Sequence, residues 1–390
     1  MATVCMVTGE YPPMVGGIAD YTARLVAALR ESGETVAVLT DRRALASGAC
    51  HGVDAVPGWG FRRLPAVIRA IRRRAPDLVH IQYQAAAYAL RGAISFLPAL
   101  LRPTPCLTTF HDTRQPYLFP KAGPLRRWAN AVLARDSRAA LCTNAADWQV
   151  IAGYGQPLVR LIPLGNNVPR QPVTARERQA ARARLGADEN DLLVGHFGLM
   201  GATKGVETLI AAVAALPRAR LAFIGAAAGA SDPQNAVAAE RARAAIAAAG
   251  LEQRVAWSGK VPLAELSHLL QACDLVVLPY HDGASFRRTT LIAALANGCA
   301  TITTAPPPGS RALAAVAGLP ELRHGENLWL VPPGDPRALA EAIRFLGEQP
   351  AARARLGEAA ARAAAAFDWK RIAEQHRQLY RETLGGDRYD

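Results

Sequence analysis

The chain of 390 residues has a length typical of two domains, and its 51% hydrophobic and 20% charged residues exclude a mainly disordered protein. Its six cysteines form no Cys-x-x-Cys pair, which argues against a zinc site or a disulfide framework and predicts buried, reduced thiols. The formal net charge is +13, and most of it lies in the first half of the chain: residues 1–170 hold 20 Lys and Arg against 10 Asp and Glu. This excess of positive charge indicates an anionic partner; the alternative is that it reflects an arginine-rich composition alone.

Short β-rich runs alternate with helical patterns throughout the first half of the chain. Strands are expected at residues 3–8, 35–40, 77–82, 106–110 and 139–143, and helices at 18–32, 61–74, 124–135 and 145–153. Strands that alternate with helices of this length predict βαβ units and a parallel sheet. A stretch rich in Pro, Gly and Asn, at 162–172, then predicts a linker between two domains.

The alternation starts again after this linker. Strands are expected at 192–197, 220–225, 254–258, 274–279, 300–304 and 327–331, and helices at 205–216, 233–249, 262–272, 287–297 and 368–384. The strand at 274–279 is apolar on both faces, as a sheet covered by helices on both sides requires. The pattern predicts two Rossmann-like domains, in which ligands bind at the carboxyl ends of the strands.

The loop at 9–20 follows the first predicted strand and opens a helix at Ile18. Its paired glycines, Gly16 and Gly17, allow a ligand to approach the backbone, and the start of the helix offers free N–H groups to an anion. The loop lacks the Gly-x-Gly-x-x-Gly spacing, so nicotinamide or flavin binding is not expected. The alternative interpretation is an ordinary flexible loop between a strand and a helix.

Two further strand ends carry candidate functional side chains. His111 follows the strand at 106–110, where it could bond a substrate hydroxyl or act as an acid or base, although a lone histidine of this kind is more often structural. Lys204 lies in a glycine-bounded loop, 196–205, which suits a diphosphate; the alternative is a solvated lysine. The spacing around Lys204 is not that of a P-loop.

A fourth segment, 280–298, joins a strand end to a helix that is predicted to begin at Arg287. Ser285 is the expected N-cap of that helix. Two arginines, Arg287 and Arg288, at a helix N-terminus oppose the helix dipole. They therefore indicate an anionic ligand at this end, unless both point into solvent.

Taken together, these segments resemble the retaining glycosyltransferase family 4 over essentially the whole chain. The resemblance rests on an ordered set of motifs: Pro-Pro…Gly16-Gly17, Thr-Phe-His111-Asp, Ile162-Pro-Leu-Gly165, Phe-Gly…Lys204-Gly205-Val-Glu-Thr-Leu, Ala294-Leu-Ala-Asn-Gly298 and His324-Gly-Glu-Asn-Leu-Trp-Leu-Val-Pro-Pro-Gly-Asp335. It implies an α/β GT-B fold of two facing Rossmann-like domains with parallel sheets and an inter-domain cleft. The expected domains are 1–168 on the acceptor side, to which a C-terminal helix near 369–386 returns, and 175–366 for the nucleotide sugar.

The family implies transfer of a sugar from a nucleotide diphosphate donor to an acceptor hydroxyl, with the anomeric configuration retained. His111 would contact the transferred sugar and is the expected catalytic residue. The residues expected to bind the donor are Gly16, Gly17, Lys204, Gly259, Lys260, Asp282, Gly283, Ser285, Phe286, Arg287, Arg288 and Thr289. Among these, Gly17 and Lys204 would hold the diphosphate, and Gly259 and Lys260 lie where the family holds the base. No metal or cofactor is expected, because backbone N–H groups and cations can stabilise the leaving diphosphate.

Several positions depart from the family pattern. Leu199 stands where the family commonly has an arginine, and Arg287 and Arg288 could replace that charge. Two glutamates are common in the fourth segment. Counted back from Gly298, their positions are Ser285 and Ala293; counted forward from Pro279, Asp282-Gly283 matches the first Glu-Gly instead, with a longer loop. These departures leave open a catalytically impaired nucleotide-sugar-binding subunit, and a nucleotide-sugar epimerase is a further alternative.

The expected partners are a nucleotide-sugar donor and a sugar, lipid-linked or small-molecule acceptor; nucleic acid is not expected. The sequence has no uninterrupted apolar run of 18 residues, so no membrane span is expected and the chain is predicted to be cytoplasmic. The basic segment 61–74 leaves open a peripheral position at the inner face of the membrane, where its arginines would dock on anionic lipid. The alternative is that its apolar stripe packs on the sheet while the arginines are merely solvated.

Overall fold

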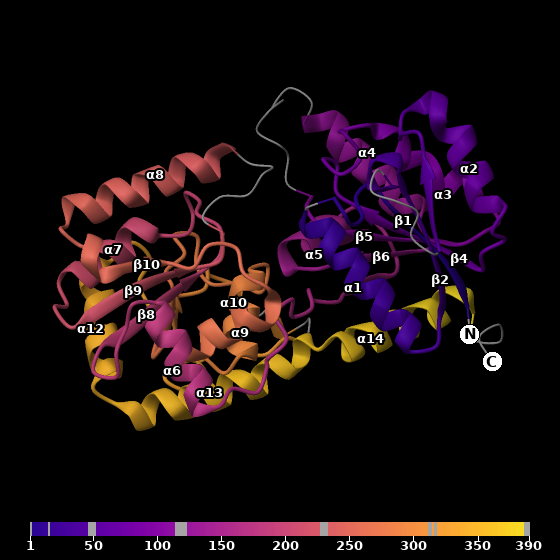
Figure 1. The fold of residues 1–390 in the computed structure, drawn as a ribbon. Helices are drawn as coiled ribbons and strands as arrows, with labels where there is room; N and C mark the ends of the chain where they lie inside the picture. The colour runs from indigo at the N-terminus through magenta and orange to yellow at the C-terminus, as the bar shows by residue number, and fades with distance from the viewer. Residues whose placement is uncertain are drawn as a thin grey trace. The chain divides into compact units, whose positions relative to one another are not determined.

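The computed structural model describes residues 2–14, 16–45, 52–113, 123–226, 233–310, 314–315 and 318–385. The chain divides into two compact units, which Figure 1 colours along the sequence. Unit 1 consists of Met1–Gly165 together with Asp368–Asp390, and unit 2 consists of Asn166–Phe367. Each unit is built on one parallel β-sheet, and each is described by itself below.

The sheet of unit 1 has the strand order β3-β2-β1-β4-β5-β6-β7, and all of its paired neighbours are parallel. The strands are β1 (Thr3–Thr8), β2 (Thr35–Asp41), β3 (Val53–Val56), β4 (Leu78–Tyr83), β5 (Cys106–Phe110), β6 (Ala139–Cys142) and β7 (Val159–Leu161). Strands β4, β5 and β6 are buried along their whole length, as central parallel strands are. The chain order reverses between β1 and β4, so their carboxyl ends form the kind of switch point at which ligands bind.

Helices cover both faces of this sheet. They are α1 (Gly17–Glu31), α2 (Leu64–Arg72), α3 (Leu97–Leu101), α4 (Gly123–Asp136), α5 (Ala145–Ala152) and α14 (Trp369–Leu384). One hydrophobic cluster joins the sheet to α2, α3, α4 and α5, and a second joins it to α1 and α14. Although α14 comes from far along the sequence, it packs against α1, as the yellow and indigo helices of Figure 1 show.

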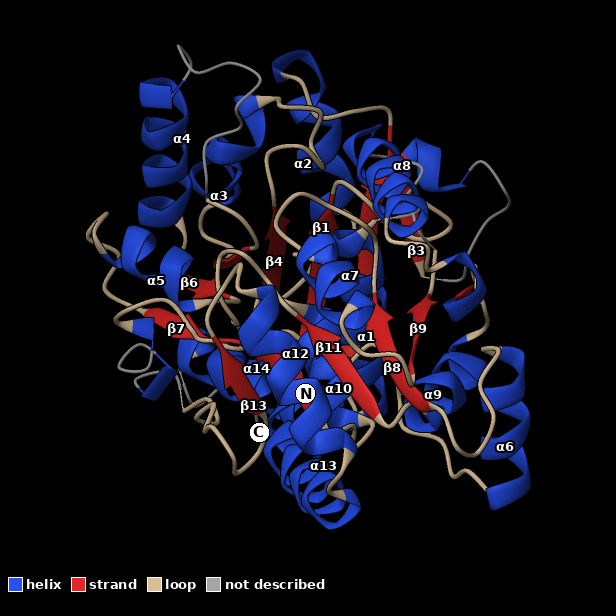
Figure 2. Cartoon of the chain, turned by 90° about the vertical axis from the view of Figure 1, so that its left-hand side faces the viewer, coloured by secondary structure: helices blue, strands red, loops and turns tan. Residues whose placement is uncertain are grey.

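The sheet of unit 2 has the order β10-β9-β8-β11-β12-β13 and is again parallel. The strands are β8 (Leu192–Phe197), β9 (Ala219–Ile224), β10 (Val255–Trp257), β11 (Leu275–Leu278), β12 (Thr301–Thr304) and β13 (Trp329–Val331). Figure 2 shows β9, β8 and β11 side by side. The order reverses between β8 and β11, which places the switch point of this unit at their carboxyl ends.

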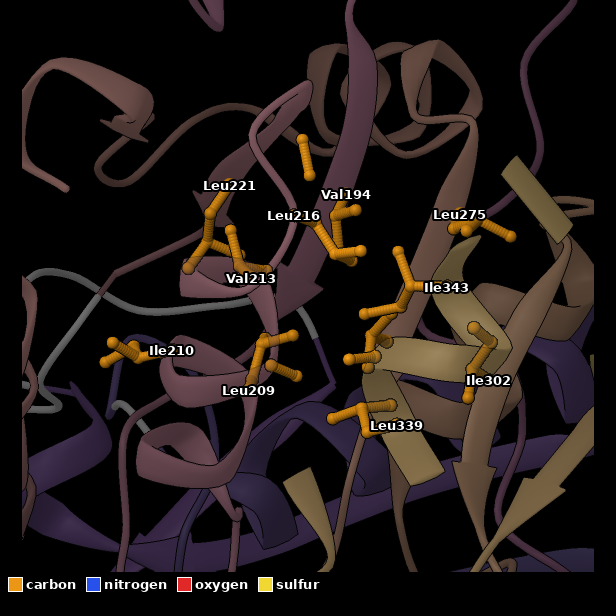
Figure 3. Packing of buried hydrophobic residues seen from close by; sticks show 14 of the residues in the cluster. Val194, Leu209, Ile210, Val213, Leu216, Leu221, Leu275, Ile302, Leu339 and Ile343 are labelled. Atoms are coloured by element: carbon orange, nitrogen blue, oxygen red, sulfur yellow. The ribbon is translucent and has the colours of Figure 1, made fainter. Parts of the chain in front are cut away.

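The helices of unit 2 pack apolar side chains onto this sheet. They are α6 (Ala175–Arg184), α7 (Val206–Ala214), α8 (Pro233–Ala248), α9 (Leu263–Ala272), α10 (Thr289–Ala296), α12 (Pro336–Gly347) and α13 (Pro350–Ala364). In Figure 3, Leu209 of α7 and Ile343 of α12 lie in one buried cluster with Val194 of β8. Burying one such aliphatic side chain contributes roughly 1.5–3 kcal/mol, so this core anchors both helices to the strands that precede the site loops.

The predicted α/β fold with two parallel sheets is confirmed. The strands predicted at 3–8, 106–110 and 192–197 have the predicted bounds, and the predicted linker lies between β7 and α6 without a helix or strand of its own. Elements that the sequence patterns did not reveal are β3, β7, α3, α6, α12 and α13. The helix predicted at 61–74 starts as a 3₁₀ turn, Phe61–Arg63, before α2.

Five of the six cysteines are buried and free, in agreement with the predicted reduced thiols. Cys50 lies outside the described residues. Within the described part of the chain, every helix is too short or too polar to cross a bilayer.

Candidate functional site

One group of candidate site residues lies at the carboxyl end of β1 in unit 1. Gly16 has an extended backbone, and a side chain in place of Gly17 would meet nothing within 4 Å. The first N–H groups of a helix have no acceptor within it, so this open start of α1 suits an anion or a hydroxyl. A neighbouring acid, Glu10, was not predicted as a site residue, although it stands in the same loop. Partial burial raises the pKa of the Glu10 carboxyl, and the charge of Arg43 opposes that rise.

His111 directly follows β5 and is held by its neighbours. Its backbone N–H donates to the carbonyl oxygen of Tyr83 at 3.0 Å, and its Nε2 lies 2.8 Å from Oε1 of Gln82. Its ring and that of Tyr21 form a T-shaped pair with a centroid distance of 4.8 Å. Burial lowers the pKa of His111 to about 3, and proximity to His376 adds to the effect. The ring is therefore neutral at physiological pH, a state that donates one hydrogen bond and accepts one.

A separate group of candidate site residues lies in unit 2, where the loops after β8 and β11 meet. Gly205 has a φ of 66°, and a Cβ there would clash with the carbonyl oxygen of Pro279. Only glycine therefore allows the start of α7 to lie so close to the end of β11. This approach brings Lys204 to Tyr280, with the Lys204 Nζ 5.3 Å from the centroid of the ring.

Arg288 approaches the same aromatic ring. Its Cζ lies 4.9 Å from the centroid of Tyr280, which is fully buried and hydrogen-bonded through its hydroxyl to Thr290 at 2.7 Å. Burial lowers the pKa of Lys204 to about 8; the charge of Arg288 adds to this shift and that of Asp282 opposes it. Because the charge of Arg288 disfavours the protonated form of Lys204, a polyanion bound beside both cations would stabilise this site.

The loop after β11 turns so that Asp282 faces Arg288. Gly283 has a φ of 81°, and a Cβ there would lie 2.7 Å from the carbonyl oxygen of Ala305, so the turn requires glycine. The Nη2 of Arg288 donates to Oδ1 of Asp282 at 2.6 Å and to Oγ1 of Thr203 at 3.1 Å. Because Thr203 belongs to the loop of Lys204, Arg288 ties the two loops together.

The start of α10 differs from the prediction. The helix begins at Thr289 rather than Arg287, and Arg288 occupies the N-cap position without a side-chain cap. The predicted N-cap role of Ser285 is therefore wrong, because residues 285–288 form a turn in which the N–H of Arg288 donates to the carbonyl oxygen of Ser285 at 3.1 Å. Arg287 and Thr289 are partly exposed at this helix start.

The other residues predicted to bind the donor lie on nearby loops of unit 2. Phe286 is 7% exposed and packs against Phe367, with a centroid distance of 4.7 Å, so its ring supports the loop from inside. Gly259 forms an isolated β-bridge with Gly225 beyond the ends of β10 and β9. Lys260, next to it, is exposed.

The positions that depart from the family pattern have different surroundings. Leu199 is 41% exposed beside the Lys204 loop, so a side chain there can face a ligand. Ala293 is 1% exposed within α10, so a longer side chain there would meet the core. Arg288 brings a second positive charge, beside that of Lys204, to the ring of Tyr280 in this pair of loops.

Comparison with known proteins matches two consecutive regions of the chain to two family models. Residues 16–167 match the family described as Glycosyl transferase 4-like domain, and residues 177–363 match the family described as Glycosyl transferases group 1. The chain therefore belongs to the glycosyltransferases that combine these two domains.

Individual relatives cover nearly the whole chain. D-inositol 3-phosphate glycosyltransferase of Kineococcus radiotolerans is 27% identical over 414 aligned residues, which cover 95% of this chain and 91% of the relative. Sucrose-phosphate synthase from Thermosynechococcus elongatus has a TM-score of 0.74 at 22% identity, covering 99% of this chain and all of the other. Anabaena Alr3699/HepE in complex with UDP has a TM-score of 0.76 at 19% identity, covering 97% of this chain and all of the other. The predicted GT-B fold is confirmed by these likenesses.

Proposed function

We propose that the protein transfers a sugar from a nucleotide diphosphate donor to an acceptor hydroxyl with retention of the anomeric configuration. The observation that carries the proposal is the pair of cations, Lys204 and Arg288, beside the buried Tyr280 at the switch point of unit 2. The leaving group of such a transfer is a nucleoside diphosphate, whose negative charge grows as the glycosidic bond breaks. Cations that are already in place stabilise this charge without reorganisation. A UDP complex of the same fold agrees with this class of ligand.

His111 has the chemical character that a contact with the sugar requires. Its neutral ring does not repel the positive charge that develops on the sugar as the leaving group departs. It can also hydrogen-bond a sugar hydroxyl. Retention of configuration rests on the resemblance to the retaining family.

The acceptor is proposed as a sugar, a lipid-linked molecule or a small molecule. The Kineococcus relative is named for D-inositol 3-phosphate. The basic excess of residues 1–170 agrees with an acceptor that carries or lies beside negative charge.

A panel of nucleotide sugars tests the activity. Each donor is incubated with and without acceptors that include an inositol phosphate, and products are detected by mass and by the anomeric proton coupling. A new glycoside of the donor's configuration together with free nucleoside diphosphate supports the proposal; an inverted product contradicts retention.

The exposed Leu199 and the buried Ala293 favour one second candidate, a catalytically impaired nucleotide-sugar-binding subunit. Tight donor binding by calorimetry without any product across the panel would favour that candidate. Conversion of a donor to its isomer without an acceptor would instead indicate an epimerase.

Arg288→Ala is expected to weaken nucleoside diphosphate binding about 10- to 100-fold, since a charge-assisted hydrogen bond contributes about 1.5–3 kcal/mol. The loss for the nucleoside monophosphate should be smaller, because fewer charges are contacted. Arg287→Ala should weaken diphosphate binding less than Arg288→Ala, because the contact with Tyr280 belongs to Arg288. Calorimetry with both ligands measures this, with Arg344→Ala on α12 as an exposed control. Equal losses for the two ligands would show that neither arginine contacts the terminal phosphate.

Unit 1 carries an exposed aromatic patch, made of Phe61, Phe96 and Trp128, that supports peripheral membrane contact. Phe61 and Trp128 are 63% and 53% exposed, and their rings lie 5.7 and 5.8 Å from that of Phe96. Exposed arginines on the elements of this patch, on α2 and directly after α2 are Arg62, Arg63, Arg69, Arg72, Arg73, Arg127 and Arg135. Aromatic rings favour the headgroup region of a bilayer, and basic residues favour anionic lipid.

The apolar stripe of α2 does not contribute to this surface. Leu64, Val67 and Ile71 are buried in the core of unit 1, as the alternative interpretation of this segment predicted. Arg74 is paired with Asp54. The arginines offered to lipid are therefore those outside this ion pair.

The variant Arg62→Gln, Arg63→Gln, Arg73→Gln is expected to reduce binding to phosphatidylglycerol vesicles roughly 100-fold, because each basic residue near an anionic surface contributes about 1 kcal/mol. Co-sedimentation at low and high salt measures the binding. A variant with Arg344, Arg355 and Arg362 of unit 2 changed to Gln carries the same loss of charge and should bind normally. If the wild-type protein stays in the supernatant at low salt, membrane contact is excluded and a soluble acceptor is favoured.

A further inference from the structure

Unit 1 contains a cluster of fully buried polar side chains next to His111. They are His80, Gln82, Thr109, His376 and Tyr380, and each is 0% exposed. His80 and Gln82 lie on β4, Thr109 lies on β5, and the other two lie on α14, which packs against α1 (Figure 1). A buried polar group costs free energy unless it is hydrogen-bonded, so the pattern of bonds within this cluster is informative.

The bonds form a continuous relay from α14 to His111. The Nδ1 of His80 lies 2.7 Å from the hydroxyl of Tyr380, and its Nε2 lies 2.7 Å from Oγ1 of Thr109. The amide nitrogen of Gln82 lies 3.2 Å from the same Nε2. The amide oxygen of Gln82 lies 2.8 Å from Nε2 of His111.

All three histidines of this region are neutral. Burial lowers the pKa of His80 well below its usual range, with His376 and His111 contributing. It lowers the pKa of His376 to about 4 and that of His111 to about 3. Each ring therefore carries one proton, and its partners decide on which nitrogen that proton lies.

The orientation of the Gln82 amide decides the proton position on His111. The amide nitrogen, which only donates, faces two acceptors: Sδ of Met6 at 3.1 Å and Nε2 of His80. The amide oxygen, which only accepts, faces Nε2 of His111, so the proton of His111 lies on Nε2. On His80, the proton then lies on Nδ1 and is donated to Tyr380, while Thr109 donates to Nε2.

The reversed arrangement is disfavoured by the sulfur of Met6. If the proton of His80 moved to Nε2, the Gln82 amide would have to turn over and present its oxygen to the Met6 Sδ. An oxygen and a thioether sulfur are both acceptors, so that contact would hold no hydrogen bond. His111 would then receive a hydrogen bond at Nε2 and carry its proton on Nδ1.

We propose that Gln82 is a positioning residue for His111. Oriented by His80 and Met6, its amide oxygen holds the His111 proton on Nε2. Nδ1 of His111 is thereby left as a hydrogen-bond acceptor for a substrate hydroxyl. Among the described residues, Nδ1 of His111 has no hydrogen-bond partner, and His111 as a residue is partly exposed. The part of this inference that concerns the substrate rests on the proposed function; the part that concerns the proton does not. Its consequence is that the protein selects substrates that offer a hydroxyl hydrogen to His111.

Long-range ¹H–¹⁵N NMR of the histidine-labelled protein tests the position of the proton without any substrate. The signals of His111 are assigned by their loss in His111→Asn. We expect the wild-type ring to show a protonated Nε2 and a bare Nδ1. A proton on Nδ1, or a doubly protonated ring at pH 7, overturns the proposal even if no variant of the relay folds.

Two variants then test the relay. Gln82→Met keeps the size of the side chain but loses the amide. Tyr380→Phe removes the hydroxyl that accepts the His80 proton. Both variants should shift the His111 proton from Nε2 toward Nδ1. Thr22→Val is the matched control, because Thr22 is buried in α1 and its hydroxyl has no partner among the described residues. An unchanged His111 spectrum in Gln82→Met overturns the proposal, and a shift in Gln82→Met alone removes only Tyr380 from the relay.

Steady-state kinetics separates this inference from the proposed function. In Gln82→Met, turnover should fall about 10- to 100-fold while the donor KM stays within about threefold. The reason is that Nδ1 of His111, which would no longer accept a hydrogen bond once it carries the proton, acts at the reacting sugar. The melting temperature reports any general loss of stability. If the proton moves as expected but turnover does not change, Gln82 positions His111 as proposed and His111 does not contact the substrate hydroxyl.

Discussion

Lys204→Ala is expected to lower kcat/KM for the donor by a factor of about 30 to 1000, equivalent to about 2–4 kcal/mol of transition-state stabilisation. The reason is that Lys204 is fixed beside Tyr280 by a glycine that brings α7 against the end of β11. Its charge is therefore in place before the leaving diphosphate forms. Initial rates with a donor that the panel identifies measure this effect.

The pH dependence distinguishes charge from packing at Lys204. The pKa of Lys204 is about 8, so the ammonium form predominates at pH 7 and is lost as the pH rises through about 8. Binding of a diphosphate favours the protonated form, so affinity should decline above this pH in the wild-type protein but not in Lys204→Met, which keeps much of the stem. Lys370→Ala, an exposed lysine of α14, is the control. Turnover of Lys204→Ala within twofold of wild type would exclude the diphosphate role.

His111→Ala is expected to reduce turnover about 10- to 100-fold with a smaller change in donor KM, because a contact made mainly in the transition state appears in kcat. The substitution also leaves the buried amide oxygen of Gln82 without its donor, so the melting temperature must be measured alongside. His111→Asn is the informative companion, since its amide can still donate toward Gln82. A change confined to KM would place His111 among the ordinary binding residues.

The overall fold was predictable because its central strands are mostly apolar, and β11 is apolar on both faces. The sequence of β8 and that of β5 identify buried strands without reference to any partner. The edge strands β3 and β7 are short and half-exposed, so they lack this pattern. The helix α6 is polar on nearly every face, yet a local pattern marks its start: Thr174 and Glu177 form a capping box.

The candidate site was predictable only where its residues are close in sequence. The loop of Lys204 is recognisable from its glycines, but the meeting of Lys204 and Arg288 at Tyr280 depends on how two loops, some 80 residues apart, turn at Gly205 and Gly283. The predicted N-cap was wrong because a turn precedes α10, which local composition does not reveal.

Gln82 shows the same limit in unit 1. It pairs with Thr109 across β4 and β5, and this register alone brings it to His111 two residues later. A glutamine in an apolar strand gave a signal of its own, because a buried polar side chain requires a partner. Its partner could be identified only once the strand order was known.

The return of α14 to unit 1 has a consequence for synthesis on the ribosome. The strands of unit 1 are translated first, but Tyr380, which accepts the His80 proton, emerges only after all of Asn166–Phe367. At about 5–20 residues per second, that delay lasts on the order of 10 to 40 seconds. During this interval the α14-facing surface of the first sheet is uncovered, because α14 has not yet been translated. Unit 1 is therefore begun first, but its last helix is added only after the whole of unit 2 has been translated. A chaperone that protects this exposed surface would act before translation ends.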